Sequence, residues 1–76
     1  MESLLEIIAK NIVDNPEDVK VNKVEGSRSV ILELEVADED MGKVIGKNGR
    51  IAKAIRTVIK AAATKEKKRV IVEIIQ

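Results

Sequence analysis

The spacing of apolar residues divides the 76-residue chain into helical and strand-like segments. Residues 4–14 have apolar side chains at helical spacing, and Ser3 with Glu6 fits a capping box, so a first helix is expected there. Asn15-Pro16 should end this helix, because proline disfavours helical geometry in the residue before it. The stripe that faces the core consists of Leu4, Leu5, Ile8, Ala9 and Ile12.

Two strands joined by a turn are expected next. Residues 19–21 begin the first strand, but Val24 has the opposite parity, which suggests a bulge or an early end. Residues 25–28 have the composition of a hairpin turn. The second strand shows the period-two pattern of a half-buried strand, with one face made of Val30, Leu32, Leu34 and Val36.

Two helices and a strand complete the pattern. Asp38 is a suitable N-cap for a short helix that ends near Ile45, and Met41, Val44 and Ile45 should face inward. A third helix follows residues 46–49, and residues 69–75 alternate as a strand. The apolar stripe of the third helix consists of Ile51, Ala54, Ile55, Val58, Ile59 and Ala62, and its opposite side holds Arg50, Lys53, Arg56, Thr57 and Lys60.

The element order is therefore α-β-β-α-α-β, without a linker or repeat, and residues 1–76 are expected to form a single domain. A right-handed crossover would place the third strand beside the second and put the two central helices on one face of the sheet. The first helix must then cover the rest of that face. The expected fold is α+β, a three-stranded mixed sheet with three helices on one face.

Composition limits the chemistry that the chain can perform. The sequence has no Cys and no His, which removes the usual zinc ligands, and the few Ser and Thr have no candidate base beside them. The acidic residues 38–40 do not fit the EF-hand pattern, and residues 42–48 do not fit a P-loop. We expect a non-enzymatic protein without a metal or another cofactor.

The net charge of +1 hides a strong asymmetry along the chain. Residues 1–41 contain four Lys/Arg and eleven Asp/Glu, whereas residues 42–69 contain ten Lys/Arg and one Glu. A polyanion should therefore be attracted to the second part and repelled by the first. No segment has the roughly 18 apolar residues of a membrane span, and the N-terminus lacks the basic region of a signal peptide, so a cytoplasmic protein without membrane contact is expected.

The most informative segment is Gly46-Lys47-Asn48-Gly49. Two glycines three positions apart allow the backbone to turn sharply and a bulky group to approach it. The residues between them are polar and one is cationic, and the turn opens a helix within the basic part of the chain. These properties outline a site for a phosphate backbone, and RNA is the leading candidate partner.

Residues 44–51, Val-Ile-Gly-Lys-Asn-Gly-Arg-Ile, resemble the (Val/Ile)-Ile-Gly-x-x-Gly-x-Ile signature of KH domains. The element order is similar to the type II, prokaryotic arrangement of that fold. A chain of this length with one KH domain most resembles the small bacterial KhpA-type (YlqC) RNA-binding proteins, and the resemblance covers essentially the whole sequence.

The resemblance implies a groove for about four single-stranded nucleotides, with the glycine loop against the sugar-phosphate backbone. Lys47 and Asn48 would contact RNA at the loop tip, Val44 would form part of an apolar floor, and Arg50 with Lys53 would extend the phosphate contacts. The RNA-binding residues implied in this way are Gly42, Lys43, Val44, Gly46, Lys47, Asn48, Gly49, Arg50 and Lys53.

The chain contains no Phe, Tyr or Trp, so bases cannot stack on aromatic side chains. Such stacking contributes about 1–3 kcal/mol per base, and a lone domain should therefore bind RNA weakly and with little sequence preference. The resemblance implies a homodimer, or a pair with a larger Jag-type KH protein, in RNA metabolism or chaperoning, and linkage would raise the affinity. Two alternatives remain: a KH scaffold that mainly dimerises and uses its acidic first helix and hairpin, or a protein that binds single-stranded DNA.

Overall fold

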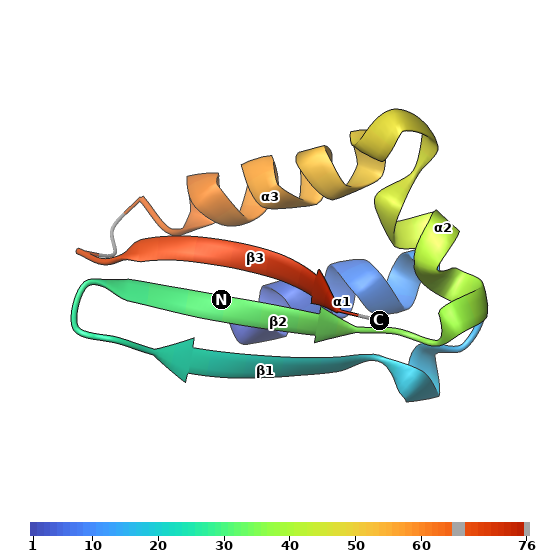
Figure 1. The fold of residues 1–76 in the computed structure, drawn as a ribbon, viewed down its shortest axis with the longest axis horizontal. Coiled ribbons are helices and arrows are strands. Elements are labelled where there is room, and N and C mark those ends of the chain that lie inside the picture. Colours follow the sequence, from blue (N-terminus) through green and yellow to red (C-terminus); the bar gives the residue numbers. More distant parts are fainter. Residues whose placement is uncertain (65–66, 76) are drawn as a thin grey trace.

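A three-stranded sheet carries three helices on one of its faces (Figure 1). The computed structural model describes residues 1–64 and 67–75. The predicted α+β fold of the type II KH order is confirmed. The helices and strands are α1 Glu2–Ile12, β1 Lys20–Glu25, β2 Ser29–Glu35, α2 Met41–Ile45, α3 Arg50–Ala62 and β3 Arg69–Ile75, and three short 3-10 turns occupy Pro16–Asp18, Asp38–Asp40 and Lys47–Gly49.

The sheet has the order β1-β2-β3, with β1 antiparallel and β3 parallel to β2. The parallel pair requires the crossover through α2 and α3 that the sequence predicted. The expected bulge or early end at Val24 is wrong, because β1 pairs with β2 in continuous register from Lys20 to Glu25. Val24 lies opposite Ile31, which alternates with the buried Val30 and Leu32 and so belongs to the face of the sheet that the helices leave open.

The core lies between the sheet and the helices and contains no aromatic side chain. Each element contributes branched aliphatic or small side chains, as the sequence required. The large apolar side chains that are fully buried are Leu5 of α1, Leu32 and Leu34 of β2, Val44 of α2 and Ile59 of α3. The core therefore holds α2 and α3, and the turn between them, against the sheet.

Helix α1 differs from its prediction at both ends. It begins at Glu2 with Met1 as the N-cap, and the Met1 carbonyl accepts a hydrogen bond from the Leu5 N–H, so Ser3 lies inside the helix and forms no capping box. The helix ends at Ile12 rather than near residue 14. The reason for the early end is that the next backbone N–H groups bind a side chain from another part of the chain.

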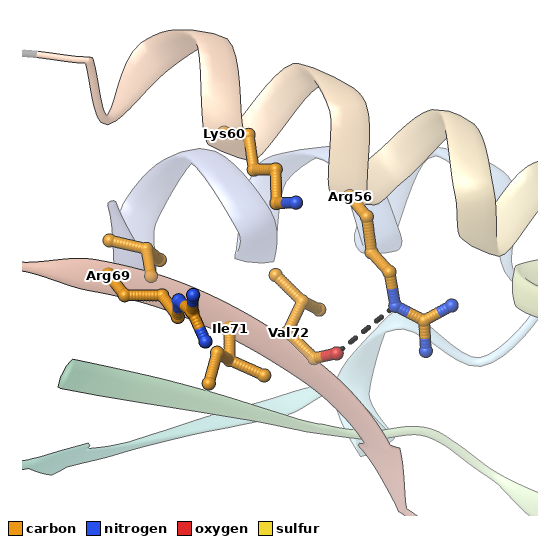
Figure 2. A pocket seen from close by; sticks show the side chains of 6 residues that line it. Arg56, Lys60, Arg69, Ile71 and Val72 are labelled. Atoms are coloured by element: carbon orange, nitrogen blue, oxygen red, sulfur yellow. Dashed lines mark hydrogen bonds between the residues drawn. The ribbon is translucent and has the colours of Figure 1, made fainter.

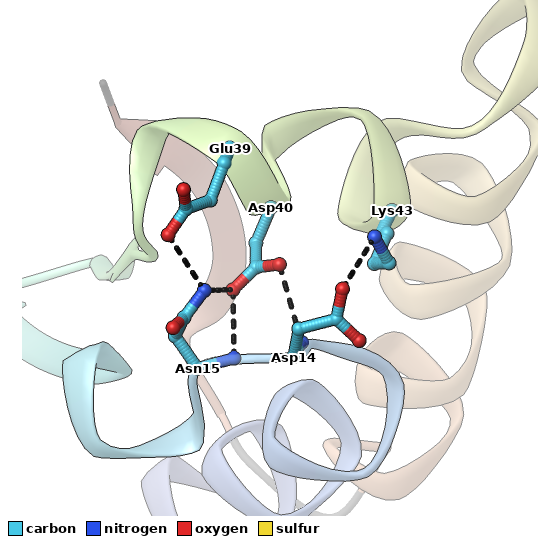
Figure 3. A network of polar contacts seen from close by, with 5 residues as sticks. All are labelled: Asp14, Asn15, Glu39, Asp40 and Lys43. Carbon is cyan, nitrogen blue, oxygen red and sulfur yellow. Dashed lines mark hydrogen bonds and ion pairs between the residues drawn. The ribbon is translucent and has the colours of Figure 1, made fainter.

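That side chain is Asp40, which is fully buried (Figure 3). Its carboxylate accepts hydrogen bonds from the Asp14 N–H at 3.1 Å, from the Asn15 N–H at 3.0 Å and from Asn15 Nδ2 at 3.0 Å. Burial alone would raise the pKa of Asp40, but these hydrogen bonds, first that of the Asn15 side chain, outweigh burial and lower it. Asp40 thus joins the end of α1 to the start of α2.

The capping role expected for Asp38 is also wrong. Residues Asp38–Asp40 form a 3-10 turn, and Asp40 is the N-cap of α2 without a side-chain hydrogen bond to that helix. The acidic residues are instead used across the chain, since Glu39 Oε1 accepts from Asn15 Nδ2 at 2.9 Å. Sequence spacing shows only local partners, and these partners lie about 25 residues away.

Candidate nucleic-acid interface

The turn between α2 and α3 has a backbone that few residues can adopt. Gly46 has φ 75° and ψ 175°, Asn48 has φ 58°, and Gly49 has φ 73°. The conformation of Gly46 is essentially restricted to glycine, whereas the left-handed conformation of the other two residues is also open to Asn. The backbone therefore restricts the residue type at three of the four positions of the turn, most strongly at Gly46.

Gly46 is also constrained by packing. A Cβ atom at this position would lie 2.6 Å from Cγ1 of Ile51, in the first turn of α3. Gly49 differs, because a Cβ there would meet nothing within 4 Å. The first glycine thus allows close packing within the protein, and the second leaves open space at the start of α3.

The N-terminus of α3 faces this open space. Its N-cap is Gly49, so no side chain from that residue binds the first N–H groups of the helix, and no acidic residue lies in the first turn. Lys47, Arg50 and Lys53 are exposed around it, and none forms an ion pair within residues 1–64 and 67–75. A helix end without a side-chain cap, its positive dipole and cations without an ion pair together favour an anion.

A groove lies further along α3, between α3 and β3 (Figure 2). It has a volume of about 470 Å³ and is lined by Arg56 and Lys60 of α3 and by Arg69, Val70, Ile71 and Val72 of β3. Three of the six lining residues are cationic and the others are aliphatic. Such a lining suits a ligand that combines negative charge with flat apolar surface.

The wall of the groove includes the unpaired edge of the sheet. β3 is an edge strand, so half of its backbone polar groups have no partner in the sheet. The Arg69 N–H points toward β2, where it binds the Arg28 carbonyl at 3.0 Å, and the alternation of the strand therefore turns the N–H and C=O groups of Val70 and Val72 toward the groove. The Val72 carbonyl accepts a hydrogen bond from Arg56 Nε at 3.2 Å.

The structure separates the residues predicted for RNA binding into two groups. Gly46, Lys47, Asn48, Gly49, Arg50 and Lys53 share the turn and the beginning of α3. Lys43 is held elsewhere, since its Nζ forms an ion pair with Asp14 Oδ2 at 2.9 Å, and this contact raises the pKa of Lys43 (Figure 3). Gly42 is exposed in α2, with open space where a Cβ would lie.

Val44 does not fit the role expected for it. Its side chain is fully buried, so it offers no surface to a base as part of an apolar floor. Ile45, expected to face inward, is exposed instead. Met41 and Val44 face inward as expected, and Ile45 lies about 100° further around the helix from Val44, which brings it to the surface.

The prediction missed the far wall of the groove, formed by β3. The sequence predicts Arg56 and Lys60 on the basic side of α3 but not in the site, and it predicts Arg69, Ile71 and Val72 only as part of a strand. A usable signal was present, because Lys53, Arg56 and Lys60 are three and four residues apart and so form one row on the helix. The predicted crossover also implies that β3 runs beneath α3.

Comparison with known proteins places this geometry in a family. The profile described as "KhpA/KhpB, KH domain" matches residues 2–74. The chain belongs to the KhpA/KhpB family of KH domains. No solved structure matches it.

Close relatives span the same length. The KH domain is 72% identical over 75 residues to the RNA-binding protein KhpA of Clostridium perfringens, an alignment that covers 99% of this chain and 100% of that protein. It is 68% identical over 75 residues to KhpA of Caldanaerobacter subterraneus, covering 99% and 100%, and 45% identical over 76 residues to KhpA of Aquifex aeolicus, covering 100% and 96%. These names describe a binding protein and not an enzyme, in agreement with the prediction.

The KH domain has a second groove, between α1 and α3, whose lining is entirely apolar. It has a volume of about 400 Å³ and is lined by Leu4, Ile8 and Ile12 of α1 and by Ile51, Ala54, Ile55 and Val58 of α3. We call the α3 residues Ile51, Ala54 and Val58 the apolar flank. Ile51 is 38% exposed and Val58 is 46% exposed, which is unusual for side chains of this type.

The apolar flank corrects the predicted core stripe of α3. Only Ile55 and Ile59 of that stripe are buried, and the small residues Ala52 and Ala63 complete the buried side. The sheet packs against only one side of this stripe. The other side of the stripe therefore remains at the surface. Seen along the helix, the buried side lies between the apolar flank and the basic row Lys53, Arg56 and Lys60.

The part of the chain that the structure describes contains neither a candidate metal site nor a candidate membrane-spanning helix. Within residues 1–64 and 67–75, no group of His, Cys, Asp or Glu side chains is arranged to hold a metal ion. Over the same residues, none of the helices has the length and apolar character that crossing a membrane requires.

Proposed function

We propose that this KH domain binds single-stranded RNA through the 46–49 turn and the groove between α3 and β3. The observation that carries the proposal is the turn itself: its glycines and Asn48 hold a backbone that opens the uncapped N-terminus of α3 between Lys47, Arg50 and Lys53. The relatives named RNA-binding protein KhpA support RNA as the ligand.

In this proposal the sugar-phosphate backbone lies against the turn and the N-terminus of α3, where N–H groups and cations meet phosphate oxygens. The bases lie in the groove, where the half-buried Ile71 provides aliphatic surface and the β3 edge provides backbone polar groups. Since the sequence has no aromatic residue, affinity depends largely on the phosphate contacts. Binding is therefore weak, tolerant of sequence and sensitive to salt.

The test is a salt titration of binding to a short single-stranded RNA. About four phosphate contacts predict a slope near −3 for the logarithm of the association constant against the logarithm of salt concentration. The variant Lys47→Asp/Asn48→Asp should lose most of the binding and most of the slope, because it places carboxylates at the turn. Asp tolerates the left-handed conformation of residue 48, so this variant should stay folded.

The chain offers a matched control for this variant. Lys10-Asn11 is the same dipeptide on the exposed side of α1, so Lys10→Asp/Asn11→Asp makes the same change of charge far from the turn along the chain. RNA binding should be nearly that of the wild type in this control. Equal losses in both variants, or no RNA binding by the wild type at low salt, would contradict the proposal. A DNA oligomer of matched sequence measures whether the 2′-OH contributes.

The second proposed property is self-association through the apolar flank. Apolar side chains from two helices line this groove. In a symmetric dimer, the groove of each copy would be covered by the other copy. The expectation of a homodimer supports this occupant, and a small core without disulfides favours association. A larger Jag-type KH protein is the alternative occupant.

Sedimentation velocity at tens of micromolar protein tests this property. Val58→Glu should shift the protein to a monomer, because it puts a charge into the proposed contact. Ile7→Glu is the control, since Ile7 is 59% exposed on α1 but does not line the groove, and this variant should remain a dimer. A wild-type protein that sediments as a monomer would exclude the homodimer and favour a different partner chain.

A further inference from the structure

One backbone carbonyl on the open edge of β3 already accepts a hydrogen bond from a side chain of the protein. Arg56 Nε donates a hydrogen bond to the Val72 carbonyl at 3.2 Å (Figure 2). Arg56 belongs to the basic row of α3 and is otherwise exposed, and its guanidinium lies across the groove. The contact joins the two walls of the groove at the end that Arg56 and Val72 line.

This hydrogen bond changes what the groove presents to a ligand. In an edge strand, the N–H and C=O of one residue point to the same side, so Val72 alone would offer one donor and one acceptor. With Arg56 in place, the Val72 carbonyl already accepts one hydrogen bond on the groove side, and the groups around it are donors: the Val72 N–H and the free N–H groups of the guanidinium. The next carbonyl that faces the groove belongs to Val70, two residues along the strand. Lys60 and Arg69 also line the groove and add only donors.

We propose that Arg56 determines which bases the groove accepts, by covering the Val72 carbonyl. This inference rests on the proposed binding of RNA at the same site. At Val72, a base whose edge carries carbonyl oxygens, such as uracil, fits the surrounding donors. A base placed there that presents an amino group, such as adenine, needs an acceptor for that group and finds the Val72 carbonyl covered by Arg56.

When Arg56 is removed, Val72 offers a donor and an acceptor side by side. The Watson–Crick edge of adenine has the complementary pair, an amino group that donates and a ring nitrogen that accepts. The preference should then move toward adenine. Arg56 is therefore a specificity-determining residue, and its effect on base preference is separate from its charge.

The experiment compares Arg56→Met with Lys60→Met. Both variants remove one cation from the same groove and the same row of α3, but only Arg56 contacts the β3 edge within the residues that the structure describes. Binding of labelled eight-nucleotide oligo(A) and oligo(U) is measured by fluorescence anisotropy at fixed salt for the wild type and both variants. Circular dichroism checks that each variant is folded, and both replaced side chains are exposed.

Both variants should bind RNA more weakly than the wild type and should show a salt slope that is smaller by about 0.7. The ratio of the affinity for oligo(A) to that for oligo(U) should rise about three- to tenfold in Arg56→Met, as expected for one hydrogen bond exchanged. The ratio in Lys60→Met should stay that of the wild type. Because each ratio uses the same two oligomers, the free energy of base stacking within the unbound oligomers cancels when the ratios of different variants are compared.

The inference is overturned if the ratio is unchanged in Arg56→Met, or if it changes equally in Lys60→Met. It is also overturned if Arg56→Met abolishes binding to both oligomers while Lys60→Met does not, since Arg56 would then supply affinity rather than selection. Failure of the proposed function looks different: the wild type would then bind neither oligomer at low salt.

Discussion

Ile51 packs so closely over Gly46 that the distance from its Cγ1 to a Cβ at residue 46 would be only 2.6 Å. The glycine before the turn and the first apolar residue of α3 therefore form one unit. Gly46 also has φ 75° and ψ 175°, a conformation that L side chains avoid. Packing and backbone conformation thus both require glycine at this position, for two separate reasons.

Gly46→Ala should therefore destabilise the domain by about 2–4 kcal/mol, from backbone strain and overpacking together. It should also weaken RNA binding, because the start of α3 must shift. Gly49→Ala should cost only about 1–2 kcal/mol, since its φ is positive but its surroundings are open. Urea denaturation measures both values.

A double variant separates the two reasons. Ile51→Ala removes the atoms that a Cβ at residue 46 would meet, so part of the cost of Gly46→Ala should disappear in the Ile51→Ala background. Additive costs would show that backbone strain alone restricts residue 46.

The two residues Val58 and Ile59 are adjacent in the sequence but differ in burial. The sequence assigned both to the core stripe, yet Ile59 is fully buried and Val58 is 46% exposed. Ile59→Ala should cost about 3–4 kcal/mol, a large part of the stability of a domain of this size. Val58→Ala should cost less than about 0.5 kcal/mol in dilute protein. Comparable costs would mean that α3 is rotated from the position described here.

The buried carboxylate of Asp40 should make stability depend on acid pH. Its pKa in the folded protein lies below the ordinary value of 3.8, so the unfolded chain binds the proton more tightly. The stabilisation is fully present above about pH 4 and is lost as the pH falls through the lowered pKa of the folded state. Thermal unfolding of wild type and Asp40→Asn from pH 7 to pH 2 measures this dependence.

At pH 7, Asp40→Asn should unfold on the order of 5–10 °C below the wild type, because an amide cannot accept from all three donors. The difference should stay constant down to about pH 5 and shrink below pH 4. Other acids, such as Glu25, titrate in both proteins and cancel in the comparison. A difference that is independent of pH throughout would contradict this assignment.

Two lysines predicted for RNA binding should differ in their effect. Lys53 is exposed without an ion pair among the described residues, whereas Lys43 Nζ contacts Asp14 at 2.9 Å. Lys53→Ala should reduce the salt slope by about 0.7 and weaken binding several-fold. Lys43→Ala should weaken binding less than about twofold, as measured by anisotropy with the same RNA. Equal effects would show that Lys43 leaves Asp14 when RNA binds.

The sequence predicted the fold well because its strongest patterns are periodic. The alternation of Val30, Leu32 and Leu34 and the signature at residues 44–51 determined the strand, the turn and the order of elements. Element ends were less accurate. Ser3 has the spacing of a capping residue, but backbone groups at Met1 begin the helix, and Asp40 ends it from a distance of about 25 residues.

The candidate site was predicted only in part for a similar reason. The glycine turn is local in sequence, so the residues of its motif lie together in space. The groove is formed by α3 and β3, and its wall of backbone groups has no side-chain pattern that a sequence can show. Which half of the α3 stripe stays exposed depends on the angle at which the sheet meets the helix, and a helical wheel does not give that angle.

Helix α3 has 13 residues, and its surface is divided among three contacts: the core, the basic row with Arg50, and the apolar flank continued by Ala61 and Ala62. Thr57 is the one position outside these groups, and its hydroxyl donates to the Lys53 carbonyl at 2.9 Å. A saturating substitution library should therefore find α3 the least tolerant helix, with separate classes of variant that fail in folding, in RNA retention or in assembly. New binding preferences would arise more readily from changes at Arg69 and Ile71 of β3, which line the groove outside the core, than at the buried Val70 and Val72.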